Sequence, residues 1–102
     1  MSKTETGIDE KTKNKIIAII SALIPEAKIY LFGSRARGKH SEWSDVDLAL
    51  DSGKKLSSTD VGEIIDVLKG TNIPFKIEVV DMYAVSGDMR QSIEDERVIW
   101  KN

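Results

Sequence analysis

The sequence predicts an α/β domain, of the α+β type, in which a small sheet is covered by helices. Two observations support this class. Apolar residues recur at helical spacing over residues 9–24 and 58–69, whereas shorter segments near 28–32, 46–51 and 75–80 have the apolar or alternating pattern of strands. Helical and strand-type segments therefore follow one another along the chain, which favours helices packed on a sheet.

The first helix is expected over residues 9–24, because Pro25 cannot continue it. Its apolar residues lie three or four positions apart and form one buried stripe. They are Ile16, Ile17, Ile20, Leu23 and Ile24. The apolar run that follows, residues 28–32, is of strand type and predicts a buried strand.

A serine is expected to cap each of the two later helices. The first of these runs from Ser58 to about Lys69, and the last runs from Ser86 to about Glu94. Between them lies a strand over about residues 75–80. The predicted order is therefore helix, strand, strand, helix, strand and helix, with a short helical turn allowed after the first strand.

Length and composition fit one domain over residues 9–102, preceded by a flexible polar tail over residues 1–8. The 102 residues are 40% hydrophobic and include no cysteine, which excludes a disulfide framework and a thiolate metal site. No stretch approaches the ~18 apolar residues of a membrane span, and we expect a cytoplasmic protein. The net charge of −2 and the mixing of acids with bases argue against a long nucleic acid as ligand.

A glycine–serine turn follows the first predicted strand and suits phosphate binding. Gly33 lies where the chain leaves that strand and lets the backbone approach another group closely, and Ser34 adds a hydroxyl. If the next residues open a short helix, the N–H groups of its first turn would face an anion such as a triphosphate. Arg35 and Arg37 are candidates for further phosphate contacts, with simple surface positions as the alternative.

Two carboxylates, Asp45 and Asp47, lie eleven and thirteen residues after Ser34. In a strand, residues two apart point to the same face, so both side chains should project together. Two negative charges at this separation repel each other unless a divalent cation lies between them. The pair therefore predicts a Mg²⁺ site that shares its ion with phosphate oxygens.

These motifs resemble those of the minimal nucleotidyltransferases of the DNA polymerase β superfamily, over roughly residues 15–100. The signature of that family is a Gly-Ser turn, a downstream Asp-x-Asp and a third carboxylate on a later strand. The resemblance implies a polymerase β palm-like fold with a mixed sheet, and ATP or another nucleoside triphosphate as substrate. It also implies that Gly33 and Ser34 hold nucleotide phosphates, while Asp45 and Asp47 bind Mg²⁺, with two ions expected.

The third carboxylate departs from the family pattern, because Glu78 stands where the resemblance implies aspartate. Glutamate keeps the charge but lengthens the side chain by one C–C bond of about 1.5 Å. We expect Glu78 to complete the catalytic and metal-binding set, with Asp81 as the alternative acid. A non-functional interpretation also stays open, in which Glu78 is a solvated strand residue. If the longer side chain misplaces its carboxylate, catalysis is slow or absent.

The resemblance implies transfer of AMP from ATP to a hydroxyl group. Many minimal nucleotidyltransferases pair with a separately encoded helical protein of HEPN or substrate-binding type, and the resemblance implies such a partner here. Some members are antitoxins that adenylylate the partner toxin. Two alternatives stay open: a small-molecule acceptor, or a catalytically inactive protein of this fold that neutralises its partner by contact alone. Trp43, in a polar loop before Asp45, is the candidate anchor for such a partner. The sequence leaves self-association open.

Overall fold

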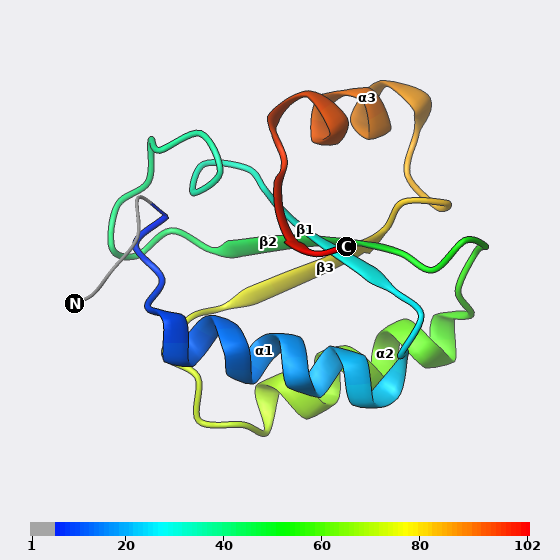
Figure 1. Ribbon diagram of the computed structural model, residues 1–102, viewed down its shortest axis with the longest axis horizontal. Helices are drawn as coiled ribbons and strands as arrows, with labels where there is room; N and C mark the ends of the chain where they lie inside the picture. Colours follow the sequence, from blue (N-terminus) through cyan, green and yellow to red (C-terminus); the bar gives the residue numbers. More distant parts are fainter. Residues whose placement is uncertain (1–5) are drawn as a thin grey trace.

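A computed structural model describes residues 6–102 and shows a four-stranded sheet between two layers of helices (Figure 1). Helices α1 and α2 lie side by side on one face of the sheet, and α3 covers the other face (Figure 1). The elements follow in the order α1 (Glu10–Leu23), β1 (Lys28–Phe32), β2 (Val46–Asp51), α2 (Ser58–Lys69), β3 (Ile77–Asp81), α3 (Gly87–Glu96) and β4 (Val98–Lys101).

The sheet is mixed, with the strand order β3-β2-β1-β4. Strand β1 pairs antiparallel with both β2 and β4, whereas β2 and β3 pair in parallel and are joined through α2. A parallel pair needs such a crossover, since a short turn can join only antiparallel strands. The predicted α/β class with a small mixed sheet is confirmed, and β2 and β3 are adjacent.

Most element bounds agree with the sequence pattern, and two details differ. The side chain of Ser57, one residue before the expected cap, accepts a hydrogen bond from the Asp60 N–H and caps α2, whereas Ser86 caps α3 as expected. The segment Val98–Lys101 forms the edge strand β4, which the sequence pattern did not assign. Its four residues are too few to show a clear alternation.

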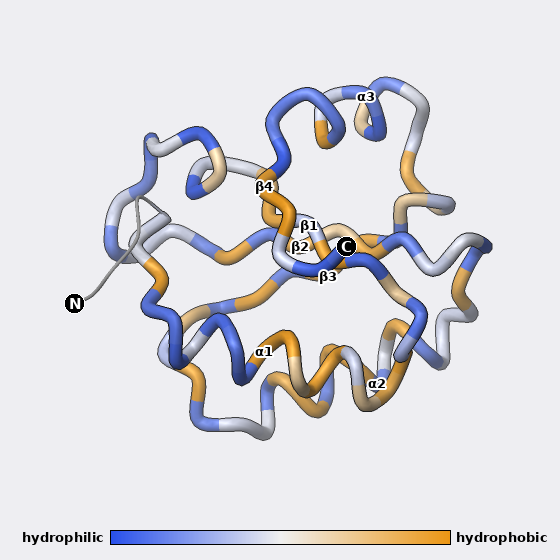
Figure 2. Tube along the Cα trace, in the orientation of Figure 1, coloured by the Kyte–Doolittle hydropathy of each residue, from blue (hydrophilic) through white to orange (hydrophobic). Residues whose placement is uncertain are grey.

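The core has two parts, one on each face of the sheet. The larger part lies under α1 and α2, where Ile16 and Ile20 of the predicted stripe meet strand residues such as Leu31 and Leu48. The smaller part lies under α3, which contributes only one buried residue, Ile93. Figure 2 shows the difference, because the inner sides of α1 and α2 are hydrophobic while α3 is largely hydrophilic. The α3 face therefore has room for polar groups beside its small core.

The segment before α1 is partly packed. Of the expected flexible tail, residues 1–8, the first five lie outside the described residues, while Ile8 is only 1% exposed and belongs to the larger core. The side chain of Asp9 then caps α1 by accepting from the Thr12 N–H. None of the helices among residues 6–102 combines the length and apolar character that crossing a bilayer requires.

Candidate active site

The sheet brings the three predicted acids to one end of β2 and β3. Asp45 directly precedes β2, Asp47 lies within it, and Glu78 of β3 is the register partner of Asp47. Val46 and Leu48, which alternate with these positions, are fully buried under the helices α1 and α2. The expectation that both aspartates share a face follows from this alternation, which places Asp47 on the α3 face of the sheet.

The charges at this end of the sheet act on one another. Burial raises the pKa of the Asp47 carboxyl above its ordinary value of 3.8, and the negative charges of Asp45 and Glu78 raise this pKa further. The guanidinium group of Arg37 opposes them in part. The three acids are therefore close enough to repel one another, while Arg37 and Lys76 offset part of their charge.

Without added divalent cations, Asp47→Asn should raise the unfolding temperature by a few degrees near neutral pH. The folded-state pKa of Asp47 is raised, so the folded protein holds this proton more tightly than the unfolded chain, and ionisation at higher pH destabilises the fold. The gain should fade as the pH falls through the raised pKa and vanish below 3.8, where both states are protonated. Thermal unfolding across this pH range measures it, with the exposed Asp66→Asn as control; a gain that does not change with pH would contradict the argument.

The glycine of the Gly-Ser turn is required by its distance from Asp47. Gly33 has a φ of +80°, and a Cβ atom at this position would collide with the Asp47 carboxylate, lying 3.2 Å from its Cγ atom. Both the left-handed conformation and the lack of space exclude a side chain. The turn that carries Ser34 is thereby held directly beside the carboxylates, which is the juxtaposition that the sequence motifs predict.

The residues after Gly33 form a closed turn in place of the short helix that the sequence allowed. The Arg37 N–H donates to the Gly33 carbonyl at 3.2 Å, and the Lys39 N–H donates to the Ser34 carbonyl at 2.9 Å. Among residues 6–102, no backbone carbonyl accepts from the N–H groups of Ser34, Arg35 or Ala36. These unpaired donors keep the capacity for binding an anion that a helix N-terminus would have.

The turn is also fixed from the distant end of α3, through Glu96. The Gly33 N–H donates to Glu96 Oε1 at 3.0 Å, and Arg37 Nη1 donates to Glu96 Oε2 at 2.8 Å. Burial disfavours the charged carboxylate, but the hydrogen bonds from Arg37 and Gly33 outweigh it and lower the pKa of Glu96 below 4.5. Glu96 could not be predicted as part of the site from the sequence, because nothing in its local pattern indicates a contact 63 residues away.

Arg35 departs from its predicted role, because its side chain does not face the site. It is 1% exposed, and its guanidinium donates to the backbone carbonyls of Thr6, Glu42 and Ser44, with distances of 2.8 Å to Thr6 and 2.9 Å to Ser44. The same group stacks 4.6 Å above the ring of Phe75. The expected phosphate contact of this side chain is therefore corrected: Arg35 ties the loop before Asp45 to the N-terminal segment.

Arg35→Met should destabilise the fold by about 2–4 kcal/mol, because the apolar side chain leaves buried carbonyl groups without donors. Arg37→Met, which removes a half-exposed ion pair, should change the unfolding free energy by less than about 1 kcal/mol. Urea denaturation of both variants measures the difference. Equal losses in the two variants would show that the loop does not depend on Arg35.

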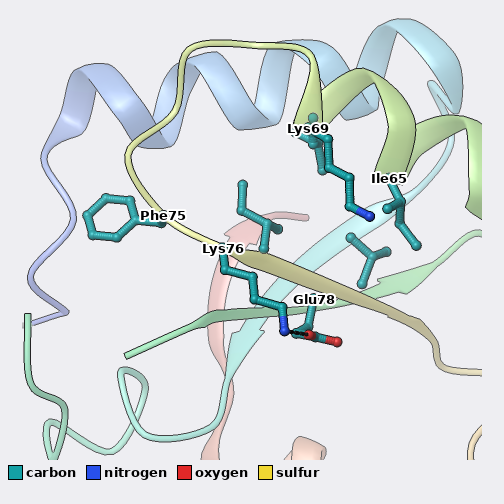
Figure 3. A pocket seen from close by; sticks show the side chains of 8 residues that line it. Ile65, Lys69, Phe75, Lys76 and Glu78 are labelled. Atoms are coloured by element: carbon teal, nitrogen blue, oxygen red, sulfur yellow. Dashed lines mark ion pairs between the residues drawn. The ribbon is translucent and has the colours of Figure 1, made fainter. Parts of the chain in front are cut away.

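The Glu78 side chain forms an ion pair with a neighbouring lysine. Lys76 Nζ lies 3.3 Å from Glu78 Oε2, and Figure 3 shows the two side chains meeting beside β3. A hollow of about 280 Å³ between α2 and β3 is lined by both, together with apolar residues such as Phe75 and Ile65 (Figure 3). Within residues 6–102, no three His, Cys, Asp or Glu side chains are arranged to hold a metal ion by themselves.

Asp81, the alternative third acid, has a different function. It is 4% exposed, and its carboxylate accepts from the Leu56 N–H at 2.7 Å and from the Tyr83 N–H at 3.0 Å. Both bonds hold the loops at the end of β3, on the side away from Glu78. Of the two candidates, only Glu78 is the register partner of Asp47.

A glycine–serine turn packed on an Asp-x-Asp strand, with an acid on the neighbouring parallel strand, defines a nucleotidyltransferase type of site. The model of the family described as polymerase beta, nucleotidyltransferase, matches residues 14–102. The chain therefore belongs to the polymerase β nucleotidyltransferase family.

The relatives of this chain are minimal members of that family. It is 28% identical over 81 residues to a Haemophilus influenzae protein named "Probable protein adenylyltransferase MntA", covering 79% of this chain and 71% of the relative. It is similar to a chain in the crystal structure of a toxin-antitoxin with AMP-PNP, with a TM-score of 0.75, 27% identity and coverage of 86% of this chain and 71% of the other. A mutant toxin-antitoxin MntA-HpeT structure also contains a similar chain, with a TM-score of 0.72, 27% identity and coverage of 85% and 69%.

Proposed function

We propose that this protein is a Mg²⁺-dependent nucleotidyltransferase that transfers AMP from ATP to a hydroxyl group of a partner protein, as an antitoxin. The observation that carries the proposal is the contact between the Gly-Ser turn and the Asp-x-Asp strand, where a Gly33 side chain would collide with Asp47. The proposal is supported by the chemistry on the two sides of this contact: N–H groups of the turn that no backbone carbonyl accepts, which suit phosphate, and carboxylates, which suit a divalent cation. The resemblance to an adenylyltransferase and to a chain crystallised with AMP-PNP supports ATP as the nucleotide.

The donor set fits Mg²⁺. Hard carboxylate oxygens are the ligands that this ion prefers. Burial and the charges of Asp45 and Glu78 raise the pKa of Asp47, and a divalent cation beside these carboxylates would offset this effect. Asp45 and Asp47 would hold the ions, with Glu78 as a further ligand. Since the described carboxylates form no complete cage, nucleotide phosphates would supply the remaining ligands. Bound Mg²⁺ supplies neutralisation of charge on the triphosphate and a lower pKa for the attacking hydroxyl.

In the reaction, the acceptor oxygen bonds to the α-phosphorus of ATP, the bond from that phosphorus to the bridging oxygen breaks, and pyrophosphate leaves. The turn at Ser34 holds the phosphates through its hydroxyl and N–H donors, and Arg37 adds a positive charge. Glu78 takes the proton from the acceptor hydroxyl, which requires its carboxylate to leave Lys76 and turn toward Asp47. The residues thus orient the reactants and move one proton.

A pyrophosphate-release assay tests this function. The chain is incubated with ATP and MgCl₂, alone and together with the helical protein encoded by the neighbouring gene. Pyrophosphate should appear at an appreciable rate only when both proteins and the metal are present, because the acceptor lies on the partner. Release that does not depend on the second protein would assign the acceptor to a small molecule or to water.

The loop before Asp45 is the proposed contact with the partner. Trp43 at its tip is 86% exposed and lies beside a hollow of about 330 Å³ that also includes Phe75. An exposed tryptophan next to such a hollow is typical of an interface anchor.

Trp43→Ala should weaken the complex with the partner by about 2 kcal/mol, roughly thirtyfold in Kd, and leave ATP binding unchanged. Tyr83→Ala, which removes a 40% exposed aromatic ring beyond β3, is the matched control and should have little effect. Calorimetric titration of the partner with each variant measures both. Equal affinity of Trp43→Ala and the unmodified chain would remove this loop from the interface.

Neutralisation of the partner by contact alone is the second candidate. The observation in its favour is the ion pair of Glu78 with Lys76, which occupies the carboxylate of the third acid. A protein of this kind would inhibit its partner equally well after Asp47→Asn. The adenylyltransferase proposal requires inhibition to depend on Asp47.

A further inference from the structure

Glu96 occupies groups that a phosphate would need. The Glu96 carboxylate accepts two hydrogen bonds, one on each oxygen. Oε1 accepts from the Gly33 N–H at 3.0 Å, and Oε2 accepts from Arg37 Nη1 at 2.8 Å. A backbone N–H and a guanidinium are the donors that proteins use to bind a phosphate oxygen. A carboxylate that bridges this pair has the charge and the acceptor geometry of an anionic ligand.

The surroundings of this carboxylate are unfavourable for a further negative charge. The charges of Asp45, Glu78 and Glu96 all act on Asp47, while Arg37 opposes them and Lys76 interacts with Glu78 and Asp45. While Arg37 is paired with Glu96, the Glu96 carboxylate neutralises most of the charge of Arg37. An incoming triphosphate therefore meets either Glu96 on the donors or a free Arg37, and these two states differ in affinity for the nucleotide.

Glu96 is also able to leave. Its side chain is 21% exposed and lies at the last residue of α3, where the helix ends and the chain continues into β4. Rotation of this side chain toward solvent exchanges two hydrogen bonds to protein for hydrogen bonds to water, without moving the backbone. The Arg37 side chain of this ion pair is half-exposed, so breaking the pair to admit a phosphate costs only a modest free energy.

We propose that Glu96 is an internal competitor for the phosphate site, which holds the Gly33 N–H and Arg37 until ATP displaces it. This inference rests on the proposed function, because it requires nucleotide to bind at this turn. Glu96 thereby sets the nucleotide affinity. As a fourth acid beside Asp45, Asp47 and Glu78, it also disfavours ATP that carries no metal to offset the charge of its triphosphate. Removing the charge of Glu96 should strengthen nucleotide binding, whereas a residue that only supports the turn would weaken binding when changed.

Calorimetry with ATP and MgCl₂ on the whole chain tests the sign of this effect. Glu96→Gln keeps the shape of the side chain and removes its charge. It should lower the Kd for ATP by about tenfold, because ATP no longer has to displace a carboxylate from the Gly33 N–H and Arg37 before it binds. Glu94→Gln is the matched control, since Glu94 lies in the same helix and pairs with Arg90 at 3.4 Å. It should change the Kd by less than about twofold.

A double variant separates occupation of Arg37 from a general effect of charge. In Arg37→Met, one of the two groups that Glu96 holds is absent and only the Gly33 N–H remains occupied, so the added Glu96→Gln change should improve the Kd by clearly less than tenfold. A tenfold gain that persists in Arg37→Met would overturn the proposal, as would weaker binding in Glu96→Gln alone. If neither the unmodified chain nor Glu96→Gln binds ATP, the proposed function falls together with this inference.

Nuclear magnetic resonance gives a second test without any substitution. On titration with ATP and MgCl₂, the Gly33 amide resonance should shift, because its acceptor changes from the Glu96 carboxylate to phosphate or water. Gly53 is the matched control, since its N–H also donates to a carboxylate, that of Asp51, at 3.0 Å, and its φ of +86° is similar. A Gly33 resonance that does not move at saturating nucleotide would overturn the displacement of Glu96.

Discussion

Asp47→Asn is expected to abolish transfer of AMP, with a loss of roughly a thousandfold or more, equivalent to ~4 kcal/mol of transition-state stabilisation. Asp45→Asn should lose a similar amount. The neutral amide is a poor ligand for Mg²⁺ and cannot balance its charge, so binding of ATP in the presence of MgCl₂ should weaken together with the rate. Calorimetry with and without MgCl₂ and single-turnover assays with the partner measure the two effects separately.

The control for these variants is their folding. Asp47→Asn removes a charge that burial and neighbouring acids disfavour, so the variant should fold at least as well as the unmodified chain. Loss of activity then reports on the site and not on the fold. ATP binding of equal strength with and without the metal would remove Asp45 and Asp47 from the metal site.

Glu78→Gln should lower the rate of transfer by about a hundredfold or more, because the amide cannot accept the proton of the acceptor hydroxyl. Glu78→Asp should keep or raise the rate. The shorter side chain lies on the same face of β3, and its carboxylate is released from the ion pair with Lys76. Single-turnover rates of both variants with saturating ATP measure this, and the affinity for ATP should change less than the rate.

Comparing the rates of Glu78→Gln and Glu78→Asp tests the role of this acid. Asp81 cannot take over, because its carboxylate is buried and accepts from the N–H groups of Leu56 and Tyr83. Activity of Glu78→Gln equal to that of the unmodified chain would therefore show that the reaction proceeds without a third acid. Inactivity of both variants and of the unmodified chain would favour neutralisation by contact alone.

The parts of the fold that depend on local pattern could be predicted from the sequence. The stripe of Ile16 and Ile20, the break at Pro25 and the alternation in 46–51 each act over a few residues, and the corresponding elements have the expected bounds within a few residues. The strand β4 could not be predicted, because only its pairing with β1, about seventy residues earlier in the chain, makes it a strand.

The site shows the same division. The Gly-Ser turn and the Asp-x-Asp pair are local motifs, and the structure places Gly33 beside Asp47 as their order suggested. Arg35 and Arg37 are indistinguishable in sequence, yet one is buried among carbonyl groups and the other pairs with Glu96 at the edge of the site. Burial and long-range contacts decide between them, and these depend on the complete fold.

The central claim, that this chain adenylylates a partner protein through Asp45 and Asp47, is tested most directly by the intact mass of that partner. The protein encoded by the neighbouring gene is co-purified with the chain, incubated with ATP and MgCl₂, and analysed by mass spectrometry. The account predicts a gain of one or more AMP units, which Asp47→Asn prevents. Tight binding and inhibition of the partner without any gain in mass, unaffected by Asp47→Asn, would contradict it.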